Sequence, residues 1–193
     1  MTEATHWTIF INAALINNFV LAYFLGLCPF FGVSTKLDTA VRMGGAVSFV
    51  MLVASTCAFF LNLLLEALGA PYLRIVSYVM VISSTVQLIE MLLKKLSPAT
   101  FRALGIYLPL ITTNCAILGL ALFQANRGYG FSQSIAFALG AGAGFALALV
   151  LMAGIRQKLE LATVPELLRG TPVAFVVAGV LSMGFMGFAG LGR

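Results

Sequence analysis

Hydrophobic residues fill most of the chain in long runs, and short polar or charged segments separate these runs. A transmembrane helix needs about 20 mostly apolar residues, and the polar breaks leave room for six such helices. The predicted spans are residues 8–27, 40–65, 72–93, 102–123, 131–155 and 172–191. Strands of a membrane barrel would be about ten residues of alternating pattern, which the runs do not show. The pattern therefore predicts an all-α integral membrane protein with six transmembrane helices.

Composition supports this fold class. Of the 193 residues, 61% are hydrophobic and 9% are charged, whereas about a quarter of the residues in a soluble domain are charged. So few charges cannot cover a water-facing surface. Because the connections between the predicted spans are short, we expect a single membrane domain over residues 1–193, embedded in the lipid bilayer.

The positively charged residues lie mostly on one side of the predicted spans. Lys and Arg are enriched in the cytoplasmic loops of membrane proteins. The loops after the first, third and fifth spans hold most of them: Lys36, Arg42, Lys94, Lys95, Arg102, Arg156, Lys158 and Arg169. The opposite side holds Arg74, Arg127 and Arg193. We therefore expect both termini on the outer side. This asymmetry accounts for the net charge of +5, so nucleic acid is not an expected partner.

Polar residues interrupt the first span at two places. Asn17 and Asn18 lie among apolar residues, which is costly in lipid unless both side chains find partners. One interpretation is a hydrogen bond between helices, worth about 1 kcal/mol or less. The other is a break in the helix, either here or between Gly26 and Pro29, because glycine and proline allow a chain to bend.

The fourth span has a similar cluster. Pro109 interrupts the helical hydrogen bonds one turn before Thr112, Thr113, Asn114 and Cys115. A single Thr in a helix often bonds only to its own backbone. The whole cluster, directly after a proline, is more than helix packing requires.

Other polar or small residues have simpler interpretations. Cys57 lies among Ala, Thr and Phe and is expected to be a small buried hydrophobic residue. Glu90 and Lys94 have the spacing of a helical ion pair, although Glu90 could also relay protons. Together with Asn17 and Asn18, Glu90 is a weaker candidate for an ion path. The glycines of residues 140–144 predict close helix packing.

Cys28 and Cys115 are separated by nearly half of the chain, and each has a Leu-Gly-Leu beside it. Two halves of three spans each, about residues 1–96 and 97–193, would have opposite orientations, as in many transporters with inverted repeats. Spans 1 and 4 would then be antiparallel and could bring the two thiols together. Straight helices would hold these thiols at different depths, so we expect both helices to be discontinuous near Cys28 and Cys115.

The two thiols are incomplete as a metal site. A thiolate is a good ligand for soft metals, and none of the three cysteines belongs to a C-x-x-C pair,. An iron–sulfur cluster takes four ligands, and the only histidine, His6, lies far from both cysteines in the sequence. If a cluster is bound, a second polypeptide must supply two more ligands.

Three segments carry a resemblance to a known family. Residues 17–21 (NNFVL), 24–30 (FLGLCPF) and 108–116 (LPLITTNCA) closely resemble the A subunits of bacterial Rnf electron-transport complexes. The likeness continues to residues 185–188 and covers essentially the full length. The related E subunit of the Na⁺-pumping NADH:quinone oxidoreductase is the nearest other family.

This resemblance implies a subunit of the bacterial inner membrane, with periplasmic termini, that pairs with a homologous E subunit. Cys28 and Cys115 would supply half of the ligands of a shared [2Fe–2S] cluster. Residues expected to support the cluster or the helix breaks are Gly26, Pro29, Pro109, Thr112, Thr113 and Asn114. The complex, with further B, C, D and G subunits, would couple electron transfer between ferredoxin and NAD to Na⁺ or H⁺ movement. No catalytic residue and no activity of the single chain are expected.

Two other functions are also compatible with the sequence. An inverted-repeat ion or solute carrier could use the broken helices 1 and 4 as its binding site. That function leaves two thiols without a role and offers few buried charges, with Glu90 as the main one. A purely structural assembly subunit would tolerate replacement of both cysteines without loss of electron transfer.

Overall fold

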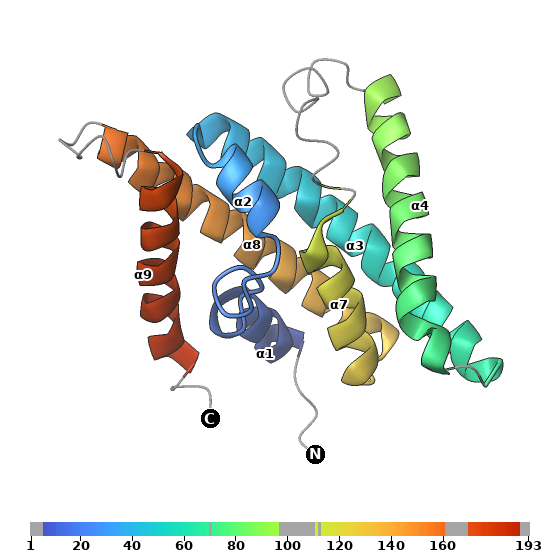
Figure 1. Cartoon of the computed structure of the whole chain (residues 1–193). Coiled ribbons are helices and arrows are strands. Elements are labelled where there is room, and N and C mark those ends of the chain that lie inside the picture. The colour runs from blue at the N-terminus through green and yellow to red at the C-terminus, as the bar shows by residue number, and fades with distance from the viewer. Residues whose placement is uncertain (1–5, 70, 97–110, 112, 161–169, 190–193) are drawn as a thin grey trace.

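The computed structural model describes residues 6–69, 71–96, 111, 113–160 and 170–189, and their regular secondary structure is helical (Figure 1). The expected all-α class is therefore confirmed for the described part of the chain. The elements in order are α1 (His6–Ile11), the π-helix η1 (Asn12–Ile16), α2 (Leu27–Val33), α3 (Leu37–Ala67), the 3₁₀-helix η2 (Pro71–Leu73), α4 (Arg74–Leu96), α7 (Cys115–Asn126), α8 (Phe131–Glu160) and α9 (Thr171–Ala189).

Three of the described helices are long and apolar enough to cross a membrane. They cover Leu37–Ala67, Arg74–Met91 and Phe131–Leu159, close to the second, third and fifth predicted spans. Shorter apolar helices occupy the regions of the other three spans, at His6–Ile16, Cys115–Asn126 and Thr171–Gly187. Pro109 and Thr112, where a break in the fourth span was expected, lie outside the described residues.

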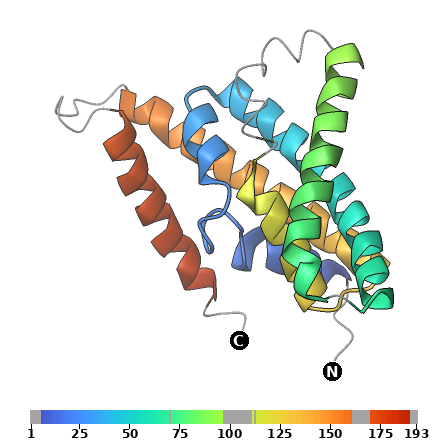
Figure 2. The ribbon, with the colours of Figure 1, turned by 45° about the vertical axis from the view of Figure 1, so that its right-hand side comes forward.

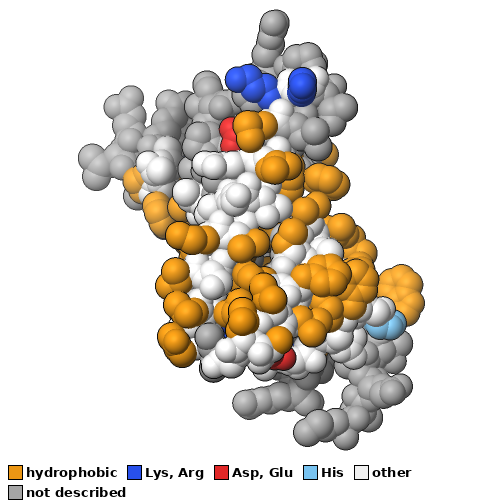
Figure 3. Space-filling view, turned by 90° about the vertical axis from the view of Figure 1, so that its right-hand side faces the viewer, with side chains coloured by type: hydrophobic (Ala, Val, Ile, Leu, Met, Phe, Trp, Pro, Cys, Tyr) orange, Lys and Arg blue, Asp and Glu red, His pale blue; other side chains and the backbone are white. Residues whose placement is uncertain are grey.

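The surface is that of a membrane protein. Figure 3 shows hydrophobic side chains over the middle of the face that includes α4, with Lys and Arg side chains at the end where α4 terminates. Large apolar side chains such as Leu63, Val76, Met80 and Met91 are exposed. Their exposure is costly in water, whereas acyl chains solvate them without cost.

The crossing of α3 and α8 forms the centre of the fold. A methyl group added at Gly44 would lie 2.8 Å from Ala146 Cβ, and one added at Gly142 would lie 2.8 Å from Ser48 Cβ. Both distances are shorter than van der Waals contact, so the two helices approach this closely only because these positions lack side chains. Small residues at helix contacts are typical of membrane proteins.

Another face of α8 lies directly against the backbone of the first span. A Cβ at Gly140 would lie 2.5 Å from the Phe10 carbonyl oxygen, and a Cβ at Gly144 would lie 2.6 Å from the Ala14 carbonyl oxygen. The neighbours are backbone atoms, which cannot turn away as a flexible side chain could. α8 is therefore packed between α3 and the N-terminal helices.

The first span changes conformation several times. α1 passes into the π-helix η1 at Asn12, and the backbone is not helical from Asn17 to Gly26. Two residues in this stretch have left-handed φ values, Phe24 at 56° and Gly26 at 83°. Such values are readily adopted by glycine but are uncommon for phenylalanine. The α-helix resumes at Leu27, so Cys28 lies in the first turn of α2.

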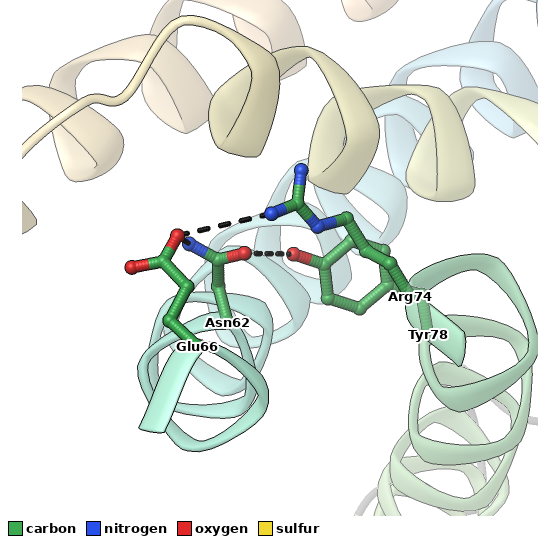
Figure 4. Close-up of polar contacts among 4 residues, drawn as sticks. All are labelled: Asn62, Glu66, Arg74 and Tyr78. Carbon is green, nitrogen blue, oxygen red and sulfur yellow. Dashed lines mark hydrogen bonds and ion pairs between the residues drawn. The ribbon is translucent and has the colours of Figure 1, made fainter. Parts of the chain in front are cut away.

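A polar cluster joins the end of α3 to the start of α4, and Figure 4 shows Arg74 and Tyr78 of α4 pointing toward Asn62 and Glu66 of α3. Tyr78 Oη donates to Asn62 Oδ1 at 3.2 Å, Asn62 Nδ2 donates to Glu66 Oε1 at 2.8 Å, and an Arg74 guanidinium nitrogen lies 3.8 Å from Glu66 Oε1. Because Tyr78 is fully buried, these bonds satisfy polar groups and fix the angle between the two helices.

The contact between α8 and the first span predicts a difference between two glycine substitutions. Gly140→Ala should lower the free energy of unfolding by roughly 1–3 kcal/mol, because overpacking of a tight contact is destabilising. Gly154→Ala on the same helix should leave stability unchanged or raise it by up to about 1 kcal/mol, since a Cβ there meets nothing within 4 Å. Thermal unfolding of the purified protein in detergent measures both. Equal stability of the two variants would contradict the described packing.

Candidate functional site

Two helices that each carry a cysteine begin side by side. Cys115 is the first residue of α7, and Cys28 is the second residue of α2. The Gly26 backbone N–H donates to Cys115 Sγ at 2.9 Å. In both Figures 1 and 2, α2 and α7 start near the middle of the molecule and run toward opposite ends. The sulfur of Cys115 therefore lies at the N-terminal end of the helix that carries Cys28.

Both thiols are free and exposed at the surface of the chain. Neither forms a disulfide. Within the part of the chain that the structure describes, no group of three or more His, Cys, Asp or Glu side chains could hold a metal ion. Both thiols are therefore accessible from outside the chain.

Asn114 determines where α7 begins. It is the N-cap residue, with extended backbone angles, and its Oδ1 accepts a hydrogen bond from Ala116 N at 3.0 Å. Asn is among the preferred residues at this position because its side chain satisfies a free backbone N–H. Cys115 consequently occupies the first helical position of α7.

Gly26 allows the close approach of the two segments. Its φ of 83° suits glycine, and a Cβ at this position would lie 2.7 Å from Phe145 Cε2, 3.2 Å from Ala116 Cβ and 3.2 Å from Asn114 Oδ1. A larger residue would push α2 away from the start of α7. The sequence predicted that the chain bends near Gly26. The hydrogen bond between Gly26 and Cys115 was not predicted and is seen only in the structure.

Asn18 anchors the non-helical stretch to α8. Its side chain is 1% exposed, and its Nδ2 donates to Ala14 O at 3.1 Å and to Gly144 O at 2.7 Å. Its Oδ1 accepts from Val20 N at 3.0 Å and from Leu21 N at 3.4 Å. The sequence offered two interpretations of Asn18, a hydrogen bond between helices or a break in its own helix. In the structure, Asn18 lies in the non-helical stretch and also bonds to α8.

Ser182 of α9 holds the same stretch from another side. Its hydroxyl donates to the Leu21 carbonyl at 2.6 Å, and the hydroxyl is buried. Irregular backbone that is buried in a protein requires such hydrogen-bond partners. Asn18 and Ser182 supply them.

Arg156 of α8 fixes the far end of α2. Its guanidinium donates to the Phe31 carbonyl at 3.0 Å and to the buried Ser34 hydroxyl at 2.9 Å. A cation at a helix C-terminus satisfies free carbonyls and interacts favourably with the dipole. In the sequence, Arg156 stood out only as one of the loop charges. No local pattern could have identified its role, since its partners are more than a hundred positions away in the chain.

An apolar groove runs from Cys115 along α7. It encloses about 330 Å³ and is lined by Leu25, Cys115, Leu118, Gly119, Leu122, Phe123 and Asn126. Gly119 keeps the groove open near Leu25, because a Cβ at Gly119 would lie 2.9 Å from Leu25 Cδ1. One thiol of the site is therefore at the end of a hydrophobic groove.

The other candidate residues lie in varied places. Pro29 is buried in the first turn of α2, where a proline is tolerated, and Thr113 is exposed just before Asn114. Asn17 bonds to Asn12 and Tyr23 of its own segment. Glu90 lies in the last turns of α4 rather than at the start of α2 or α7.

Cys57 differs from the other two cysteines. It lies within α3 and is partly exposed. The Thr85 hydroxyl of α4 lies 4.0 Å from its sulfur, so Cys57 takes part in the contact between α3 and α4. It is less buried than the sequence suggested.

Comparison with known proteins identifies the family. Residues 6–192 match the family described as "Rnf-Nqr subunit, membrane protein". The chain belongs to the Rnf-Nqr family of membrane proteins. The resemblance expected from the three sequence segments is thus confirmed, and the match covers both cysteine helices.

Individual Rnf-Nqr relatives align over nearly the whole chain. A protein of Syntrophotalea carbinolica is 54% identical over 184 residues, which is 95% of each chain. Proteins of Serratia proteamaculans and Yersinia enterocolitica are 51% and 50% identical over 192 residues, which is 99% of this chain and 98% of theirs. Each of these relatives is named as the A subunit of an ion-translocating oxidoreductase complex.

Arg156 should control the stability of α2 in this Rnf-Nqr protein. Hydrogen bonds to charged groups contribute about 1.5–3 kcal/mol, so Arg156→Ala should raise amide hydrogen exchange over residues 27–34 by roughly tenfold or more. Hydrogen-exchange mass spectrometry measures this rate.

Arg127→Ala is the matched control. Arg127 is exposed at the end of α7, where it donates to Tyr129 Oη at 2.9 Å, so this variant should leave exchange in α2 unchanged. If both variants, or neither, changed the exchange of residues 27–34, Arg156 would not be the residue that holds α2.

Proposed function

We propose that this chain is a membrane subunit of an ion-translocating Rnf-type oxidoreductase complex, in which Cys28 and Cys115 hold half of a [2Fe–2S] cluster shared with a homologous subunit. The observation that carries the proposal is the hydrogen bond from Gly26 N to Cys115 Sγ, at 2.9 Å. It joins the starts of two helices that each present an exposed thiol. The name shared by the relatives, which makes each of them the A subunit of an ion-translocating oxidoreductase complex, supports the assignment to a complex.

The residues at the site fit such a cluster. Thiolates are the usual ligands of iron–sulfur clusters, and both thiols are exposed at the chain surface, where a partner's ligands can reach the same metal. The side-chain Nδ2 of Asn114, next to Cys115, is a buried hydrogen-bond donor without an acceptor among the described residues. Bound sulfide or cysteinyl sulfur would provide one.

When bound, the cluster supplies one-electron transfer, and the chain supplies its placement and environment. α2 and α7 fix the two thiols, and Asn114 fixes the start of α7 next to Cys115. Leu25, Leu118 and Leu122 of the groove would give the Cys115 side an apolar environment. A low dielectric and few hydrogen bonds would lower the reduction potential, and each donor toward sulfur would raise it.

The complete topology in this proposal has six spans in two inverted repeats, about residues 1–96 and 97–193. Its support is the opposite course of α2 and α7 from neighbouring starting points (Figures 1 and 2). Interruptions in spans 1 and 4 would place both thiols inside the bilayer. In this proposal the protein lies in the inner membrane, and the distribution of Lys and Arg favours both termini in the periplasm.

The partner in this proposal is the homologous E subunit, which would provide the other two ligands. The apolar groove beside Cys115 offers a place for a hydrophobic helix of that partner. The further B, C, D and G subunits would exchange electrons with ferredoxin and NAD and couple their transfer to Na⁺ or H⁺ movement. In this proposal the single chain has no activity of its own.

A carrier with its binding site at the interrupted helices has less support. The hydrogen-bonding groups of Asn18 are occupied by backbone atoms, which leaves that residue little capacity to bind a solute. A carrier would also give no role to the paired thiols.

The proposal is tested by replacing each cysteine in the complex. In Cys28→Ser and Cys115→Ser, the heterodimer with the E subunit should lose this cluster's iron, its sulfide and its low-temperature EPR signal. Cys57→Ser is the matched control and should retain all three. Metal analysis and EPR of the purified heterodimers measure these quantities. Wild-type spectra in both Cys28→Ser and Cys115→Ser would refute the proposal.

A further inference from the structure

The side chain of Asn114 uses only one of its two polar groups. Its Oδ1 caps α7 through Ala116 N. Its Nδ2 is buried and has no acceptor within the part of the chain that the structure describes, and the residue as a whole is 5% exposed. A buried donor without a partner costs about 1–3 kcal/mol, so an acceptor beyond the described residues is expected.

The amide of Asn114 lies at the contact between the two cysteine helices. A Cβ at Gly26 would lie 3.2 Å from Asn114 Oδ1, and the Gly26 N–H itself donates to Cys115 Sγ at 2.9 Å. The amide, Gly26 and the sulfur ligand therefore share one small volume. Rotation of the amide would exchange Oδ1 and Nδ2 and break the bond to Ala116 N, so the position of Nδ2 is fixed.

Capping alone does not explain an amide at this position. Asp caps helices about as well as Asn, and it would accept from Ala116 N without leaving a buried donor. Compared with Asp, Asn adds an NH₂ group, and this donor lies one bond farther from the backbone than a Ser or Thr hydroxyl would. This group must be useful to whatever the neighbouring cysteine binds.

We infer that Asn114 Nδ2 donates a hydrogen bond to a sulfur atom of the iron–sulfur group held by Cys115, and that this bond raises the reduction potential of that group. The inference rests on the proposed function. Reduction adds negative charge to the sulfur atoms, so a donor stabilises the reduced form more than the oxidised form. Asn114 thus tunes electron transfer, beyond its role as a helix cap.

Two substitutions in the intact complex separate tuning from capping. Asn114→Ser keeps a capping oxygen and adds no charge, but it replaces the NH₂ donor with a hydroxyl that lies one bond closer to the backbone. Asn114→Asp keeps the cap and the shape and replaces the donor with a negative oxygen. EPR-monitored redox titration should show a lower midpoint potential in both variants, with the larger shift in Asn114→Asp.

Asn126→Asp is the matched control. Asn126 is exposed at the opposite end of α7 and lines the same groove, so the same charge change there should shift the potential far less than Asn114→Asp. A wild-type midpoint potential in Asn114→Ser, or equal shifts in Asn114→Asp and Asn126→Asp, would overturn the inference.

A measurement on the wild-type complex covers the case in which the variants fail to assemble. With ¹⁵N in the asparagine side chains, pulsed EPR of the reduced cluster should detect a hyperfine coupling to one amide nitrogen, and its absence overturns the inference. These outcomes differ from failure of the proposed function, in which Cys28→Ser and Cys115→Ser leave the cluster signal unchanged.

Discussion

The close contact between α8 and the backbone of the first span is the constraint on which the site depends. Gly140 and Gly144 have no side chains to hold α1 and η1 away, and their added methyl groups would collide with backbone carbonyls. This contact lets Asn18 reach the Gly144 carbonyl at 2.7 Å. The chain can then leave the helix at Asn17 with its polar groups paired, as a lipid environment requires.

The departure from helical structure determines where the thiols lie. The chain continues through Gly26, which contacts the start of α7. Cys28 follows in the first turn of α2, and α2 runs in the direction opposite to α7. Arg156 holds the other end of α2 through the Phe31 carbonyl and Ser34. α8 therefore positions both ends of the segment that carries Cys28.

The sequence was sufficient for features set by the bilayer and by local chemistry. Apolar runs of the right length predicted α3, α4 and α8 to within a few residues. The unusual neighbours of Cys28 and Cys115 singled out both thiols. In contrast, the contacts of Gly26 with Cys115 and of Arg156 with Phe31 join distant parts of the chain, so no local pattern could predict them. The π-helix likewise depends on packing against α8.

The central claim is that Cys28 and Cys115 lie together in the folded chain, and the most direct test is cross-linking of the two thiols. Membranes that contain the protein would be treated with a chelator to remove iron and then with a short bis-maleimide. Mass spectrometry should detect a Cys28–Cys115 link within one chain in much greater yield than any link to Cys57. Links from Cys28 to Cys57 in equal or greater yield would contradict the account.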